Sequence, residues 1–153
     1  MEISGETGQK YRPRVIDVVL QRALEAAGAI AIEGARAGGK TMTALHAAKS
    51  YTFIDDTETQ TLLEVAPRSL LEGDKPRLLD EWQIASELWN LVRRSVDTSP
   101  SSGQFILTGS VLPADDITRH TGAGRFLRLR QRTMSWWEKL DSSARLKYPR
   151  NSV

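Results

Sequence analysis

Residues 34–41, GARAGGKT, combine glycine, lysine and threonine at a spacing that suits phosphate chemistry. They fit the pattern G-x-x-x-x-G-K-[ST], in which the glycines let successive backbone N–H groups point into one concavity. A helix beginning at Lys40 would add its own free N–H groups and the positive end of its dipole. Lys40 would then bring a positive charge to the β- and γ-phosphates, and the Thr41 hydroxyl would complete the coordination of Mg²⁺. The alternative is a glycine-rich helix start with a solvated lysine.

Polar residues also end two later apolar runs. In RLLDE, Asp80 ends a predicted strand and would hold Mg²⁺ through water, while Glu81 could polarise an attacking water. In QFILTGS, Thr108 is a candidate sensor of the γ-phosphate, with Ser110 close by. The alternatives are that the carboxylates are solvated turn residues and that Thr108 and Ser110 only terminate a strand.

The stretch RHTGAGRFLRLRQR contains five arginines in fourteen residues. Arg125 follows a turn from Gly122 to Gly124 and could stabilise charge on a transferring phosphoryl group, within one chain or from a neighbouring subunit. Two alternatives remain open. The arginines could protect an edge strand from aggregation, or they could follow a nucleic-acid backbone, although the sparse aromatic residues give little support to a nucleic-acid partner.

The elements that must position these groups follow from hydrophobic periodicity. Helices are expected at residues 15–27, 40–49 and 83–96, and strands at 29–33, 51–55, 77–81, 104–110 and 125–132. Residues 56–75 should be helical in places, with interruptions at Pro67 and Gly73. Strands that alternate with helices predict an α/β fold with a parallel sheet covered on both faces. Ligands bind at the carboxyl ends of such strands, so one site could collect all three motifs.

The helix expected at 83–96 is amphipathic. Its buried side is predicted to carry Ile84, Leu88, Leu91 and Val92. Trp82 and Trp89 are seven residues apart, so we expect both in the core. His46 and His120 lack partners at metal-ligand spacing and are expected to be packed or surface residues.

Composition restricts the classes of protein that fit. A chain of 153 residues with 40% hydrophobic content is expected to form one globular domain. Its formal net charge of +2 does not by itself indicate a nucleic-acid or membrane partner. Without cysteine, the chain has neither disulfides nor thiolate ligands. It also lacks an apolar run of membrane-spanning length and a signal peptide, so we expect a soluble, cytoplasmic protein with no membrane partner.

Taken in order, five segments resemble the amino-terminal ATPase domain of prokaryotic AAA+-type proteins, in which a second domain of unknown function follows. They are YRPRVID, GARAGGKT, LLEGDKPRLLDEWQ, GQFILTGS and RHTGAGRFLRLRQRTMSWWE. The resemblance implies a three-layer P-loop NTPase fold with a mostly parallel five-stranded sheet in the order 5-1-4-3-2. It also implies ATP and Mg²⁺ as cofactors.

The resemblance assigns roles to particular residues. By similarity, Asp80 and Glu81 form the Walker B pair, residues 108–110 form the sensor segment, and Arg125 is the arginine of an H-[ST]-G-A-G-R stretch. The nucleotide loop then comprises Gly34, Arg36, Ala37, Gly38, Gly39, Lys40 and Thr41. Ala35 stands where proline is usual in the family.

The expected organisation is a disordered segment at residues 1–10, an ATP-binding domain at 11–140 and a tail at 141–153 that is the truncated start of a second domain. The expected function is slow hydrolysis of ATP to ADP and phosphate, dependent on a homo-oligomer, a protein partner or that second domain. Two alternatives are a nucleotide-dependent binding module or remnant without hydrolysis, and a small P-loop kinase. No separate lid segment with clustered arginines supports the kinase.

Overall fold

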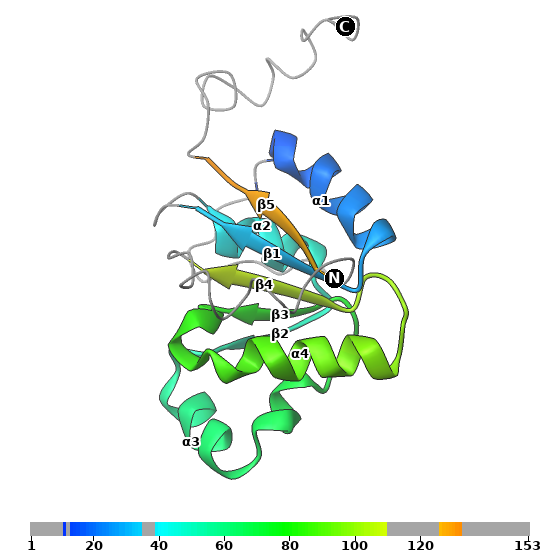
Figure 1. Ribbon diagram of the computed structural model, residues 1–153. Helices are drawn as coiled ribbons and strands as arrows, with labels where there is room; N and C mark the ends of the chain where they lie inside the picture. The colour runs from blue at the N-terminus through cyan, green and yellow to red at the C-terminus, as the bar shows by residue number, and fades with distance from the viewer. Residues whose placement is uncertain (1–10, 12, 35–38, 110–125, 133–153) are drawn as a thin grey trace, which may run out of the picture.

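Five parallel strands form a single sheet in the computed structural model, which describes residues 11, 13–34, 39–109 and 126–132. The strands lie in the order β2-β3-β4-β1-β5, and every pairing is parallel (Figure 1). Their bounds are β1 Ala29–Glu33, β2 Ser50–Phe53, β3 Arg77–Asp80, β4 Phe105–Gly109 and β5 Phe126–Arg130. This is the predicted order read from the opposite edge, so the predicted α/β P-loop architecture is confirmed.

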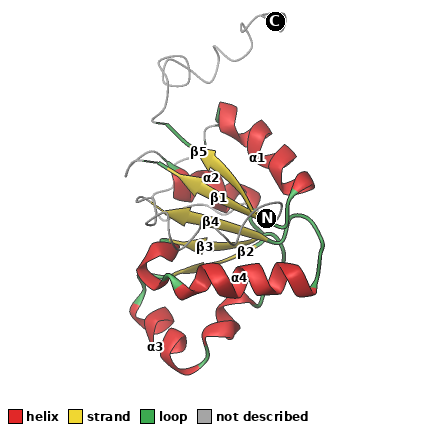
Figure 2. Ribbon diagram, viewed as in Figure 1, coloured by secondary structure: helices red, strands yellow, loops and turns green. Residues whose placement is uncertain are grey.

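Helices cover both faces of the sheet and make three layers (Figure 2). Helices α1 and α2 pack on one face, and α4 packs on the other together with two short 3-10 helices, η1 and η2. Helix α3 contacts η1. The bounds are α1 Val15–Ala26, α2 Lys40–Ala47, α3 Thr57–Val65, η1 Pro67–Leu71, η2 Trp82–Ala85 and α4 Glu87–Thr98.

The central strands are buried on both faces because successive side chains point to opposite sides. In β1, Ile30 and Ile32 pack toward α1 and α2, whereas Ala29 and Ala31 pack toward α4. The residues of β4 divide in the same way. A continuous apolar strand is therefore what this position requires, which explains why AIAI and FIL contain no polar residue.

The segment after β3 differs from the single helix predicted for residues 83–96. Glu81 leaves the strand in the left-handed conformation, with φ 58° and ψ 43°, and the chain forms the 3-10 turn η2 before α4 begins. This turn directs Trp82 into the core and leaves Ile84 49% exposed. The prediction that Ile84 shares the buried side was therefore wrong, whereas Leu88 and Val92 are buried as expected.

Helix α1 is amphipathic, but its apolar side is only partly covered. The residues Leu20, Ala23 and Leu24 are buried against the sheet. Val15 and Val18 lie outside that contact, at 75% and 60% exposure. The apolar spacing thus identified the helix correctly, but it did not separate the residues that pack from those that face outward.

Candidate functional site

Three of the sequence motifs, GARAGGKT, RLLDE and QFILTGS, meet at the carboxyl ends of the parallel strands. Asp80 of β3 lies opposite Thr108 of β4, and Glu33 of β1 lies opposite Gly109 of β4. Strand β1 leads into the glycine-rich loop, and helix α2 starts at Lys40. This is the position at which α/β sheets bind ligands.

A single carboxylate oxygen joins two of these motifs to the third. The hydroxyls of Thr41 and Thr108 both donate to Asp80 Oδ1, at 2.8 and 2.6 Å. Thr108 is 1% exposed and Asp80 is 6% exposed, so the bond between them is shielded from water, whereas the Thr41 bond is partly buried. Hydroxyl and carboxylate oxygens are the donor set that suits a hard cation such as Mg²⁺. The chemistry of this pair therefore fits the metal that the sequence predicts.

Lys40 is a buried cation in the first turn of α2. Its side chain is 6% exposed, and Nζ donates to the Gly34 carbonyl oxygen at 2.8 Å. Burial lowers the pKa of Lys40 from its ordinary value, while the negative charges of Glu81 and Asp80 act in the opposite direction. A positive charge thus lies beside both ends of the glycine-rich loop.

Glycine is required at both ends of this loop. Gly39 precedes α2 with φ 82°, in the left-handed region that glycine adopts without strain. A methyl group at Gly34 would lie 2.2 Å from the backbone oxygen of Gln131. Arg36, Ala37 and Gly38, which complete the predicted loop, lie outside the described residues.

Glu81 has an unusual backbone conformation for a residue other than glycine. Its carboxylate accepts a hydrogen bond from Gln83 Nε2 at 2.5 Å. The Gln83 amide in turn packs on the last residue of β4, where a methyl group on Gly109 would lie 2.6 Å from Gln83 Oε1. Gln83 therefore connects the acidic pair with the strand that carries Thr108.

Sequence reasoning missed several side chains that support the loop. Gln131, which follows β5, is 2% exposed, and its Nε2 donates to Thr43 Oγ1 of α2 at 3.0 Å. Arg14 Nη2 donates to the Arg132 carbonyl oxygen at 2.9 Å. Because side chains alternate along a strand, Gln131 should share the face of Leu129, which is the face toward α2. No sequence signal indicated the Arg14 contact.

The segment before α1 also packs on α2. The Tyr11 ring stacks on His46, with ring centroids 4.0 Å apart, and its hydroxyl donates to Asp17 Oδ1 at 2.5 Å. Burial raises the pKa of Tyr11 well above its usual range, and the bond to Asp17 acts in the same direction. The phenol therefore remains protonated and keeps donating at neutral pH.

Two predicted residues and one histidine cannot be placed. Arg125, Ser110 and His120 lie outside the described residues, so the structure does not relate them to Asp80 or Lys40. Within the described part of the chain, no group of three or more His, Asp or Glu side chains could hold a metal ion. A cation at Asp80 and Thr41 would accordingly need further oxygen ligands from a bound phosphate or from water.

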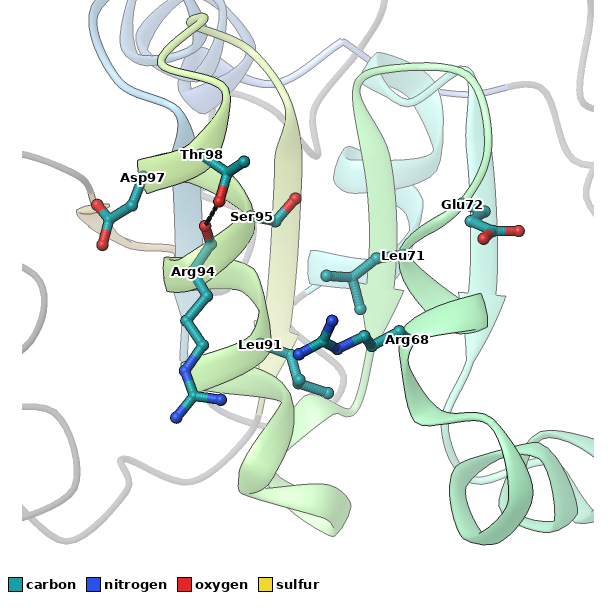
Figure 3. Close-up of a pocket in the computed structure, with 8 residues that line it drawn as sticks. All are labelled: Arg68, Leu71, Glu72, Leu91, Arg94, Ser95, Asp97 and Thr98. Atoms are coloured by element: carbon teal, nitrogen blue, oxygen red, sulfur yellow. Dashed lines mark hydrogen bonds between the residues drawn. The ribbon is translucent and has the colours of Figure 1, made fainter.

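A separate groove of about 580 Å³ lies between η1 and the second half of α4 (Figure 3). In it, the Arg68 side chain extends toward Leu91, and Thr98 Oγ1 donates to the Arg94 carbonyl oxygen at 2.9 Å. This half of α4 leads to the amino end of β4, away from the glycine-rich loop. The residues that line the groove are Arg68, Leu71, Glu72, Leu91, Arg94, Ser95, Asp97 and Thr98, and none belongs to the predicted site.

The parallel sheet order, with a glycine-rich loop between β1 and α2, defines a nucleotide-binding domain of the P-loop class. Comparison with known families matches residues 26–140 to the AAA domain, and the chain belongs to this family. The AAA-type resemblance is thereby confirmed, and the class of function is that of a nucleotide-binding, ATPase-like domain. No curated protein matches the chain. In the described residues, no helix has the length and apolar character needed to cross a membrane.

Proposed function

We propose that this AAA domain binds ATP together with Mg²⁺ and hydrolyses the ATP slowly. The observation that carries the proposal is the convergence on Asp80, whose carboxylate receives the hydroxyls of Thr41 and Thr108 beside the buried Lys40. In other words, residues from the phosphate loop, from β3 and from β4 already share one hydrogen-bonded centre. Preorganised groups of this kind would hold a cation without having to reorganise, and the cation and Lys40 would then stabilise the phosphate charge.

Each residue has a distinct proposed role. Lys40 and the backbone N–H groups of residues 34–41 bind the phosphates, while Asp80 and Thr41 hold Mg²⁺. The metal ion, when bound, neutralises charge on the phosphate oxygens. Thr108 acts as the sensor through Asp80, because its hydroxyl donates to that carboxylate. Arg125 stabilises the transferring phosphoryl group, within the chain or from a second copy.

Glu81 is the proposed base that orients the attacking water. Its carboxylate is held by Gln83 Nε2. A carboxylate engaged in this way is less available to accept a proton from water, and this supports slow turnover. The same bond favours the second candidate function, a nucleotide-dependent binding module that switches a protein partner without appreciable hydrolysis.

Binding is tested first, by calorimetry of ATP and of ADP with Mg²⁺. We expect micromolar binding by the chain and no detectable binding by Lys40→Ala, because the substitution removes the buried charge next to the phosphates. Lys49→Ala is the matched control, since Lys49 is an exposed lysine beyond the other end of α2. Absence of binding in the unsubstituted chain, or equal binding by Lys40→Ala, would disprove the proposed site.

Turnover is tested next with Glu81→Gln, which keeps the shape of the side chain and removes its basicity. We expect unchanged ATP affinity and a loss of about 10²-fold or more in the rate of phosphate release. Glu87→Gln, at an exposed position in the first turn of α4, is the control and should turn over normally. Equal rates for Glu81→Gln and the unsubstituted chain would rule out the assignment of Glu81. If neither rate exceeds the background, the binding module becomes the better description.

A further inference from the structure

Gln131 contacts the first end of the glycine-rich loop and approaches the other end, although it lies more than ninety residues further along the chain. Its backbone N–H donates to the Glu33 carbonyl oxygen at 2.8 Å, immediately before the loop. Its own carbonyl oxygen lies so close to Gly34 that a methyl group there would be 2.2 Å away. At the other end of the loop, its Nε2 would lie 3.5 Å from a methyl group on Gly39.

The same side chain also reaches the helix that follows the loop. Gln131 Nε2 donates to Thr43 Oγ1 at 3.0 Å, and the two residues are 2% and 1% exposed. The Thr43 backbone N–H completes the first helical bond of α2 by donating to the Gly39 carbonyl oxygen at 2.9 Å. The main chain of Gln131 therefore meets the first end of the loop, and its buried side-chain amide connects the edge strand β5 with the first turn of α2 beside Gly39.

We infer that Gln131 is a positioning residue that holds the phosphate loop ready for the nucleotide. This inference rests on the proposed function of the same site. Glycine gives a loop conformational freedom, and a ligand that must first order its loop binds more weakly. Gln131 holds the two ends of the loop and the first turn of α2 before a phosphate arrives, and it acts through these contacts and not as a ligand of the phosphate.

The test compares two buried glutamines that receive the same substitution. Gln131→Met keeps the approximate volume and removes the amide. Gln104→Met is the matched control, because Gln104 is 6% exposed and donates to the carbonyl oxygens of Ser99 and Ser101 at the amino end of β4. We expect both substitutions to lower the free energy of unfolding. Only Gln131→Met is expected to lose affinity for ATP with Mg²⁺, by about tenfold or more, with little change in turnover at saturation.

A double-mutant cycle identifies the bond that matters. The Thr43 side chain also acts on the Tyr11 phenol, whose pKa it lowers, so Thr43→Val alone is not specific. If Gln131 acts through Thr43, the losses of affinity in Gln131→Met and Thr43→Val are not additive in the double variant. Thr43→Ser retains a hydroxyl and should bind ATP nearly as well as the unsubstituted chain.

Amide hydrogen exchange in the absence of nucleotide gives a readout that does not depend on ATP binding. Exchange of the Thr43 amide, which reports the first turn of α2, should be faster in Gln131→Met and unchanged in Gln104→Met. Equal exchange and equal ATP affinity in Gln131→Met and the unsubstituted chain would overturn the inference, as would equal effects in the two variants. If the unsubstituted chain binds no ATP, the proposed function fails, and the exchange experiment still decides whether Gln131 holds the loop.

Discussion

At the scale of single residues, Lys40 is placed as a phosphate-binding cation would be, but its surroundings make its charged form less favourable than in water. The residue is buried, and burial lowers its pKa despite the nearby carboxylates of Asp80 and Glu81. The negative charge of a bound phosphate would favour the charged form of Lys40, which the two carboxylates alone do not fully restore. We therefore expect nucleotide binding to require the charged form of Lys40.

This ionisation predicts how ATP affinity depends on pH. Below the pKa of Lys40 the side chain is charged and affinity is constant. Above that pKa the free protein loses the charge and affinity falls. Because the pKa is lowered, the fall should begin at a lower pH than the ordinary lysine value of about 10.4 would give. Calorimetry with Mg²⁺ and ATP across neutral and alkaline pH measures this curve.

Lys40→Arg is the control for the alkaline loss. A guanidinium stays charged throughout this range, so the variant should show no such fall, even if its overall affinity is lower. The same pH curve in both proteins would show that another group titrates.

At the scale of elements, the contact between α4 and β5 packs the edge strand of the sheet against a helix. The Trp89 ring of α4 stacks on Phe126 of β5, with ring centroids 4.0 Å apart and an interplanar angle of 13°. The Arg128 guanidinium lies 5.4 Å from the centre of the Trp89 ring and 3.5 Å from Glu33 Oε1. β5 is an edge strand, and its Arg128 pairs with Glu33 of the neighbouring strand and packs on Trp89.

Truncation of Trp89 should show how much this contact stabilises the fold. The side chain is 1% exposed, and Trp89→Ala would leave a large cavity between α4 and β5. We expect a loss of about 3–5 kcal/mol in the free energy of unfolding, measured by urea denaturation. Trp89→Phe keeps an aromatic ring against Phe126 and should cost distinctly less. Equal stability of Trp89→Ala and the unsubstituted protein would contradict the packing described here.

The boundaries of elements show where local sequence is a sufficient guide. Helix α1, strand β1 and strand β4 lie close to the ranges that their apolar periodicity predicts, because burial alone determines that pattern. The segment after β3 was misread because Glu81 adopts a left-handed conformation. That conformation allows Trp82 to pack into the core, and nothing local at Glu81 indicates it.

At the scale of the whole molecule, the parallel sheet explains why motifs far apart in the sequence lie together. The order β2-β3-β4-β1-β5 puts the carboxyl ends of β3, β4 and β1 side by side. The loop after β1, the acidic pair after β3 and Thr108 of β4 are thus neighbours.

The amino-acid sequence alone determined the fold class, the phosphate-loop pattern and the candidate residues Lys40, Thr41, Asp80 and Thr108. These follow from local spacing and from the rule that parallel strands end at one edge. Tertiary structure alone decided the partners: both hydroxyls on one oxygen of Asp80, Gln83 on Glu81, and Gln131 on Thr43. The physical reason is that hydrogen-bond partners depend on strand register and on the rotation of each helix about its axis. Packing between distant segments sets both, and no short stretch of sequence encodes them.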